Sequence, residues 1–351
     1  RTVVERLKVT LLGDAPTSEQ IDPQAYTLYL QARYLGRQYN AESLQRSNDL
    51  HYQALAIEQD IAAAWSGLAT NYTNQAANGL LSTDEGFPRA RLAAEKSLEI
   101  DPDYAPAHAN LGWITYGYDN NVAQAAGHYQ RALELDPSNT YILRSAAVLL
   151  SSLNRLDEAI TLMGYVTTLD PLVASGHHNL GISYFRAHRW DEAIASNETV
   201  LRLSPDYIGA QYYIGAALLF KGEAEAALEA FAREQDEEYQ VKGAAMALHA
   251  LGREQESRTR LTELEQRWGN EWPSEVAQAH AYTGNVEAAF QWLNKAVEQN
   301  EGGLSEQFLH PAYRSLHADP RWEEFLDQVG SSSAQLEAIE FDVALPEGWS
   351  G

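Results

Sequence analysis

The sequence predicts an all-helical protein built from stacked pairs of short antiparallel helices. One observation is a proline that recurs about every 34 residues, at Pro102, Pro137, Pro171 and Pro205. Proline cannot continue a helix, so each of these residues marks the end of a unit. A second observation is the apolar pattern between the stops, which follows one face of a helix. Helix pairs this short bury their apolar faces only by stacking on neighbours, so the pattern must recur.

Residues 174–205 show the unit most clearly. A break at His188-Arg189 separates two helical patterns, and Asp191 and Glu192 open the second helix, where acidic groups favour the helix dipole. The apolar face of the first helix contains Leu180, Gly181, Tyr184 and Phe185. The inner stripe of the second contains Ala193, Asn197, Val200 and Leu203.

The recurring residues resemble those of the tetratricopeptide repeat family. That family's pattern is a large residue, Leu-Gly or Leu-Ala, Tyr, Ala, an aromatic residue, Ala and Pro. Four successive repeats match it, at Trp65, Leu68, Ala69, Tyr72, Ala90 and Pro102; at His108, Leu111, Gly112, Ala125, Tyr129, Ala132 and Pro137; at Leu143, Ala146, Ala147, Leu150, Ala159 and Pro171; and at His177, Leu180, Gly181, Tyr184, Ala193 and Pro205. The resemblance implies a right-handed superhelical solenoid of about eight helix pairs with a C-terminal capping helix.

The repeats also predict how the chain is divided. The solenoid is expected over residues 21–330, with regular repeats at 62–205, degenerate repeats at 21–60 and 208–300, and a capping segment at 304–330. Residues 1–20 are interpreted as a remnant helix of a preceding domain and a linker, with a solenoid-capping helix as the alternative. Residues 331–351 are expected to form a C-terminal tail, either disordered or docked through its apolar residues. Asn74–Pro88 reads as a loop inserted between two helices.

The capping segment has its own helix signals. Asp319 suits an N-cap, Pro320 suits the first helical position, and Gly330 suits the end of the helix. The stripe expected to be buried contains Trp322, Phe325, Leu326 and Val329.

Both ends of the repeat region resemble the tetratricopeptide region of one class of bacterial signalling proteins. The opening match consists of Ala25, Tyr26, Leu28, Tyr29, Leu30, Arg33, Tyr34 and Leu35, and the closing match is a Leu-x-x-Asp-Pro-Arg-aromatic run ending at Trp322. Proteins of this class carry a nucleotide cyclase or winged-helix effector, commonly a membrane helix, and a TolB-like domain. The resemblance therefore implies a sensory or scaffolding region, tethered to the inner membrane through upstream sequence. Whether it lies on the periplasmic or the cytoplasmic side is left open.

Composition and motifs argue against catalysis. The formal net charge of −24 opposes general electrostatic binding to nucleic acid or to an anionic membrane, and the chain has no cysteine. Walker, Gly-x-Gly-x-x-Gly, Gly-x-Ser-x-Gly and His-Glu-x-x-His motifs are all absent. The one adjacent histidine pair, His177-His178, makes a poor joint metal site because neighbours on a helix point about 100° apart. We therefore expect a non-catalytic segment with no cofactor and no metal.

The expected activity is binding of a protein or peptide. In the family, first helices line the concave face, and carrying its ligand positions over gives Asn110, Trp113, Tyr116, Arg144, His178, Asn179, Arg186, Tyr212 and Tyr213. The chaperone-tail clamp is incomplete, since Val148 stands where the family usually has Asn. We expect an extended peptide whose acidic or C-terminal carboxylate group lies near Arg144 and Arg186. Packing of the aromatic residues between repeats is the alternative for these residues, and a homo-oligomerisation platform is the alternative function.

Overall fold

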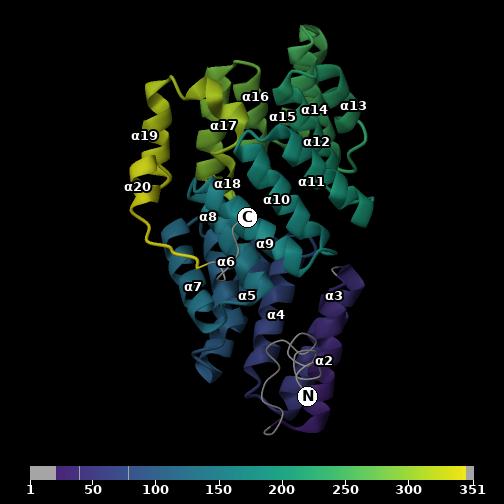
Figure 1. Cartoon of the computed structure of the whole chain (residues 1–351), viewed down its shortest axis with the longest axis vertical. Coiled ribbons are helices and arrows are strands. Elements are labelled where there is room, and N and C mark those ends of the chain that lie inside the picture. The colour runs from purple at the N-terminus through teal and green to yellow at the C-terminus, as the bar shows by residue number, and fades with distance from the viewer. Residues whose placement is uncertain (1–20, 39, 78, 345–351) are drawn as a thin grey trace. The chain divides into compact units, whose positions relative to one another are not determined.

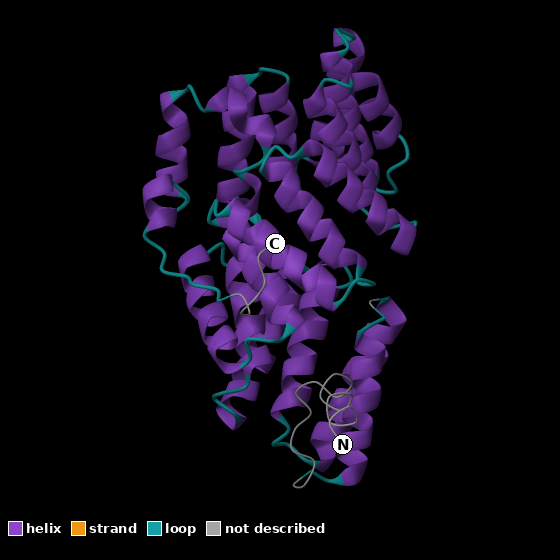
Figure 2. Cartoon of the chain, viewed as in Figure 1, coloured by secondary structure: helices purple, strands orange, loops and turns teal. Residues whose placement is uncertain are grey.

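The computed structural model describes residues 21–38, 40–77 and 79–344. Regular structure in this part of the chain is entirely helical, and no strand is found within it (Figure 2). The all-helical prediction is therefore confirmed. The expectations for residues 1–20, and for Leu345 and Trp349 in the tail, lie outside the described residues.

Helices α2 to α17 form eight consecutive pairs in the described chain (Figure 1). They are α2 (Pro23–Gly36) with α3 (Ala41–Ile57), α4 (Ala62–Ala77) with α5 (Thr83–Ile100), α6 (Ala105–Gly117) with α7 (Val122–Leu135), α8 (Thr140–Ser152) with α9 (Leu156–Leu169), α10 (Ala174–Arg186) with α11 (Trp190–Leu203), α12 (Ala210–Lys221) with α13 (Ala224–Phe231), α14 (Glu237–Ala250) with α15 (Glu254–Trp268), and α16 (Pro273–Tyr282) with α17 (Val286–Glu298). The short α18 (Leu304–Gln307), a 3-10 helix η1 (Pro311–Leu316), α19 (Pro320–Gln328) and α20 (Ser333–Glu337) follow.

A residue with left-handed backbone marks the turn inside successive pairs. These residues are Asn154, His188, Gly222, Gly252 and Gly284, with φ from 58° to 89°. In the turn at His188, the His188 N–H donates to Phe185 O and the Arg189 N–H donates to Tyr184 O. This pair of hydrogen bonds satisfies carbonyl groups in the last turn of the first helix. Asparagine and glycine tolerate the positive φ that the turn requires. The turns therefore recur with the repeat because the same backbone geometry ends each first helix.

The chain divides into two compact units. Among the described residues, one unit comprises those up to Asp119 together with Gly127–Pro137, and the other comprises Asn120–Ala126 and those from Ser138 onward. The first unit has a core that includes Tyr29, Leu68 and Ile114, and the second has cores that include Phe185, Phe231 and Leu293. Each unit thus buries its own apolar side chains, as repeats that contact their neighbours should.

The predicted loop at Asn74–Pro88 is wrong. Helix α4 continues to Ala77 and α5 begins at Thr83, so most of this stretch is helical and Pro88 lies inside α5. Phe87 is buried and stacks on Tyr118, with ring centroids 5.1 Å apart. A Cβ at Gly86 would lie 2.7 Å from the Ala76 Cβ, so glycine permits the close approach of α4 and α5. Packing against neighbouring helices overrides the turn-forming composition.

The inner stripe of α11 is shorter than predicted. Ala193, Asn197 and Val200 are buried, but Leu203 is exposed at the last position of the helix. The stripe ends one turn early because the chain leaves the helix at Ser204.

The predicted capping helix is present. Asp319 Oδ1 accepts from the Arg321 N–H at 3.0 Å, Pro320 is the first helical residue, and Trp322 is buried. Beyond it, α20 forms and Phe341 is only 2% exposed. The Arg155 guanidinium donates to Phe341 O, which agrees with the docked alternative for this part of the tail.

Candidate functional site

The segment after α17 lies against the first helices of the pairs in the second unit. We call the surface of these first helices the inner face. We call residues 300–316, which include α18 and η1, the crossing segment. Helix α18 packs against α8 (Figure 1), and η1 packs against α16. Near its start, Asn120 Nδ2 donates to Glu301 O at 2.9 Å, and the Leu304 N–H donates to Asn120 Oδ1 at 3.1 Å. Part of the inner face is therefore covered by the chain itself.

Three side chains of α16 hold the crossing segment. The Glu301 carboxylate accepts from the Ser274 N–H and from Ser274 Oγ, at 2.9 and 2.5 Å. The Tyr313 hydroxyl donates to Ser274 O at 3.0 Å. Gln307 Nε2 donates to Glu275 Oε1 at 3.3 Å, and Gln278 Nε2 donates to Gln307 Oε1 at 2.6 Å. These bonds use both main-chain and side-chain groups of α16.

The crossing segment also reaches α10 and α12 through one ring. The His310 ring lies 5.2 Å from the Phe185 ring and 6.3 Å from the Phe220 ring. Burial lowers the pKa of His310 well below its ordinary value, and the positive charges of Lys242 and Arg186 act in the same direction. His310 is therefore a neutral, buried contact at physiological pH.

A buried ion pair lies beside these contacts. The Lys242 ammonium, on α14, pairs with the Glu275 carboxylate on α16, and their side chains are 2% and 10% exposed. The ammonium also lies 4.3 Å from the ring centroid of Tyr212 and 4.8 Å from that of Tyr239. Burial alone would lower the pKa of Lys242, but Glu275 and the neighbouring acidic groups raise it well above its ordinary value. Lys242 is therefore charged.

Two further carboxyl groups face this single ammonium. Burial raises the pKa of Glu238 to about 8, against the opposing effect of Lys242. Burial raises the pKa of Glu301 to about 7, against the hydrogen bonds from Ser274, and the Glu275 charge adds to the rise. The cluster thus contains more carboxyl groups than cations.

Several buried polar atoms around the crossing segment have no hydrogen-bond partner among the described residues. They are Glu238 Oε1, Gln278 Oε1, Ser305 Oγ and His310 Nε2. Buried polar groups in folded proteins are nearly always paired with protein or ordered water.

The part of the inner face around α8 and α10 is more open. Arg144 and Asn179 are half-buried. Arg144 Nη1 donates to Ser175 Oγ at 3.2 Å, and the guanidinium lies 5.5 Å from the centroid of the Tyr141 ring. No carboxylate of residues 21–38, 40–77 or 79–344 pairs with Arg144, in contrast to Arg155 and Arg189. We call Tyr141, Arg144, Ser175 and Asn179 the rim.

The other predicted contacts in the second unit mostly pack within it. Arg186 is buried and donates to Ser151 Oγ at 3.0 Å. His178 Nδ1 lies 2.8 Å from Asn197 Oδ1, and its ring lies 5.4 Å from that of Tyr213. Tyr212 is 2% exposed and stacks on Tyr239. The prediction of Arg186 and Tyr212 as open ligand contacts is therefore corrected, because burial removes them from the surface. For His178 and Tyr213 the packing alternative fits better.

The predicted contacts in the first unit are also mostly internal. Asn110 is 2% exposed, and its Nδ2 donates to Ser66 O and Ser66 Oγ at 3.0 Å. Tyr116 is likewise 2% exposed, and the half-buried Trp113 packs against the core of the unit. The prediction of Asn110 and Tyr116 as ligand contacts is corrected, because both side chains face the helix interfaces.

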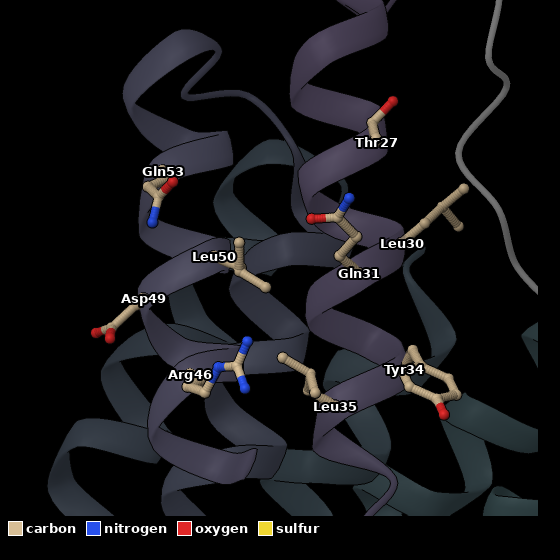
Figure 3. A pocket seen from close by; sticks show the side chains of 9 residues that line it. All are labelled: Thr27, Leu30, Gln31, Tyr34, Leu35, Arg46, Asp49, Leu50 and Gln53. Atoms are coloured by element: carbon tan, nitrogen blue, oxygen red, sulfur yellow. The ribbon is translucent and has the colours of Figure 1, made fainter. Parts of the chain in front are cut away.

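A surface groove lies between α2 and α3 in the first unit (Figure 3). It encloses about 620 Å³ and is lined by Thr27, Leu30, Gln31, Tyr34, Leu35, Arg46, Asp49, Leu50 and Gln53. Tyr34 is 69% exposed, which is unusual for an aromatic side chain. In Figure 3, Leu35 and Leu50 point into the space between the two helices.

The sequence reading missed the buried cluster and the crossing segment. One signal was present: Lys242 is the only charged residue between Val241 and Leu248 on a helix whose other residues are mostly apolar. No comparable signal marks Glu301, because its contact with Ser274 joins residues 27 positions apart.

No cluster of histidine and acidic side chains suited to a metal ion occurs in the described part of the chain. Nor does any described helix have the length and apolar character to cross a membrane.

Comparison with known proteins identifies the repeats. A model of the tetratricopeptide repeat matches residues 114–171 and 178–239. These two stretches are similar to tetratricopeptide repeats. The matched residues include α8, α9, most of α10, and α11 to α13. Arg144 and Asn179 of the rim lie among them. The fold class predicted from the sequence is confirmed.

Two curated relatives and one solved structure are similar to parts of this chain. The chain is 31% identical to Superkiller protein 3 of Schizosaccharomyces pombe over 144 residues, which cover 39% of this chain and 10% of that protein. It is 24% identical over 210 residues to the human protein O-mannosyl-transferase TMTC3, covering 58% of this chain and 21% of that protein. The chain therefore spans at most about a fifth of these relatives. The human IFIT1 dimer with PPP-AAAA is similar in fold, with a TM-score of 0.51 and 16% identity, over 76% of this chain and 72% of that chain.

Proposed function

We propose that this tetratricopeptide-repeat segment is a non-catalytic scaffold that binds a protein through the rim of its second unit. The observation that carries the proposal is the state of Arg144. Its guanidinium is half-buried and held by Ser175 and Tyr141, yet it has no carboxylate partner in the described chain. In a chain of net charge −24, such a cation attracts an acidic group of a partner.

The neighbouring Asn179 completes the chemistry of the rim. Its side chain offers a carbonyl oxygen and an NH₂ group, which can pair with the main chain of an extended peptide. Tyr141 adds an aromatic surface beside the guanidinium, and aromatic residues and arginine are the common anchors of binding sites. The proposed ligand is thus an extended peptide with an acidic side chain or a C-terminal carboxylate at Arg144.

A displayed peptide library tests this proposal. Peptides selected on the wild-type chain should be enriched in acidic groups, and Arg144→Ala should weaken their binding by about 1–3 kcal/mol. Arg189→Ala is the control, because Arg189 pairs with Glu192 and follows α10, the helix that carries Ser175 and Asn179. Selection of peptides without acidic groups, or equal loss in both variants, would refute the rim as the site.

We further propose that the scaffold belongs to a larger bacterial signalling protein with a cyclase or winged-helix effector. The support is the sequence resemblance at residues 25–35 and before Trp322. The proposal places the segment beside an inner membrane through upstream sequence, on a side that the resemblance leaves open. Sequencing the complete gene tests it, since an upstream region without an effector or TolB-like domain would contradict the proposal.

A homo-oligomerisation platform is the second candidate. The observation in its favour is the α2–α3 groove, where the exposed Tyr34 lies beside Leu30 and Leu50. Light scattering at high salt distinguishes the two functions, because salt screens the repulsion between acidic chains. A concentration-dependent mass that Tyr34→Ser abolishes would favour the platform, and a fixed monomer mass would exclude it for this segment.

A further inference from the structure

Inside each unit, one contact between successive pairs recurs. The first helix of a pair packs against the second helix of the pair before it, as α4 does on α3, α6 on α5, α10 on α9 and α12 on α11. Helix α2 is the first helix that the structure describes, and no described helix precedes it. The face of α2 that corresponds to this contact is therefore open to another segment.

The α2–α3 groove lies on the outer face of α2 (Figure 3). The groove is lined from α2 by Thr27, Leu30, Gln31 and Tyr34, whereas the buried residues of the helix are Ala25, Tyr29 and Ala32. Because successive helix residues are about 100° apart, these two sets lie on opposite sides of α2. A terminal repeat normally presents a polar outer face to water, but this groove also contains the half-buried Leu35 and Leu50.

The chain enters the pair at one end of this groove. Asp22 Oδ1 accepts from the Gln24 N–H at 2.8 Å, and the Asp22 N–H donates to Glu58 Oε2 at 2.8 Å. Asp22 is therefore fixed where α2 begins and α3 ends. Residues 13–22 extend to at most about 33 Å, which exceeds the length of about 21 Å for the 14 residues of α2. The sequence before residue 13 can consequently reach every part of the groove.

Residues 1–12 have the chemistry that this groove requires. In a helix, one side of this stretch would contain Val3, Val4, Leu7 and Leu11. The stretch carries three cations and one carboxylate, whereas residues 21–60, which form the groove, carry three cations and five carboxylates. These opposite net charges favour contact, while the net charge of −24 opposes the approach of a second copy.

We infer that residues 1–12 bind in cis in the α2–α3 groove as a helix, in the place that the second helix of a preceding pair takes elsewhere in the repeats. The apolar side of this helix covers Leu30, Leu35 and Leu50 and the ring of Tyr34. The helix caps the first repeat, and while it is bound it withholds the groove from a second copy of the chain. The inference does not depend on the rim, and it makes the homo-oligomerisation platform the competing occupant.

Cysteine crosslinking of the full chain tests the inference, because the natural chain has no cysteine and only introduced thiols can pair. The test chain carries Leu7→Cys with Leu50→Cys. One control replaces Leu7→Cys by Glu5→Cys, on the opposite side of the segment, and the other replaces Leu50→Cys by Leu92→Cys, on the exposed face of α5. Under mild oxidation at low protein concentration, the test chain should form its intramolecular disulfide about tenfold faster than either control, because docked thiols need no search of the volume that the tether allows.

Non-reducing gels and mass spectrometry of digests identify the products. A selective intramolecular disulfide between positions 7 and 50 supports the inference. Equal rates in the test chain and the two controls would overturn it. A product of twice the chain mass, formed as fast by Leu50→Cys alone, would overturn it as well, since this product would place a second copy in the groove.

Hydrogen exchange provides a second measurement that needs no thiol. In the full chain, Leu7→Asp should speed amide exchange several-fold in residues 27–35 and 46–53, because the docked helix suppresses local opening of α2 and α3. Val9→Asp is the matched control, since it places the same charge on the opposite side of the segment. Circular dichroism establishes that both variants are folded. Exchange that is unchanged in Leu7→Asp, or equally fast in both variants, contradicts the inference.

Discussion

The Lys242 ammonium pairs with the Glu275 carboxylate in the interior of the second unit, joining α14 to α16. The stacked rings of Tyr212 and Tyr239 enclose the same ammonium. A buried pair is strongly destabilised by loss of one partner, because the remaining charge stays in a site of low polarity. A substitution of either partner should therefore change the free energy of unfolding strongly.

Lys242→Met should lower the free energy of unfolding by about 3–5 kcal/mol, because Glu275 is left buried without its cation. The double variant Lys242→Met with Glu275→Leu should recover much of the loss, since both charges are then removed. Urea unfolding followed by circular dichroism measures both. A double variant no more stable than the single one would show that the two charges are not coupled.

The stability of the second unit should fall as the pH rises. The folded-state pKa values of Glu301 and Glu238, about 7 and about 8, lie above the ordinary value of 4.5. Their contribution is therefore complete below about pH 4.5 and is lost as the pH rises through 7 and 8. Between about pH 6.5 and 8.5 we expect a loss of about 1–3 kcal/mol.

Histidine does not account for that fall. Burial lowers the pKa values of His178 and His310, so their contribution is lost only as the pH falls below about 6.5. The measurement is thermal unfolding at the two pH values for the wild type and for Glu238→Gln with Glu301→Gln. A slope that the double variant leaves unchanged would assign the effect to other groups.

Trp322→Ala should destabilise the C-terminal cap by about 3–5 kcal/mol. Trp322 is 4% exposed, and its ring contacts Tyr313 and Phe325. Trp272→Ala is the control, because that ring is 42% exposed. Melting curves that shift equally for both variants would contradict the assignment of Trp322 to the core.

Two glycine positions should respond in opposite directions. A Cβ at Gly243 would lie 2.2 Å from the Phe231 ring, so Gly243→Ala should destabilise the contact between α13 and α14. Nothing lies within 4 Å of a Cβ at Gly164, in the middle of α9, so Gly164→Ala should stabilise by about 0.5–1 kcal/mol. Thermal unfolding of both variants checks this, and a stabilised Gly243→Ala would disprove the close packing.

Local signals predicted most of the fold. The break predicted at His188-Arg189 falls where the structure has a left-handed turn, because the turn is specified by residues next to it. The loop predicted at residues 74–88 was wrong because a distant contact decides the structure there. There the contact of Phe87 with Tyr118, 31 positions away, favours a helix that local composition disfavours.

The site was less predictable than the fold. Arg144 and Asn179 remain predictions as ligand contacts, since their partly exposed positions agree with that role without testing it. Family positions could not reveal that Arg186 donates to Ser151 or that residues after α17 cover the inner face. Such facts depend on contacts between distant repeats, which no single repeat encodes.

The central claim is that a partner polypeptide binds at the rim. Photo-crosslinking tests it most directly, with a benzoylphenylalanine in place of Asn179 in the complete protein in its source cell, and Glu198 and Gln31 as comparison positions. We predict an adduct at position 179 that Arg144→Ala abolishes, and none at Glu198, which lies exposed on α11. An adduct confined to Gln31 or Glu198, or one at 179 that persists in Arg144→Ala, would contradict the account.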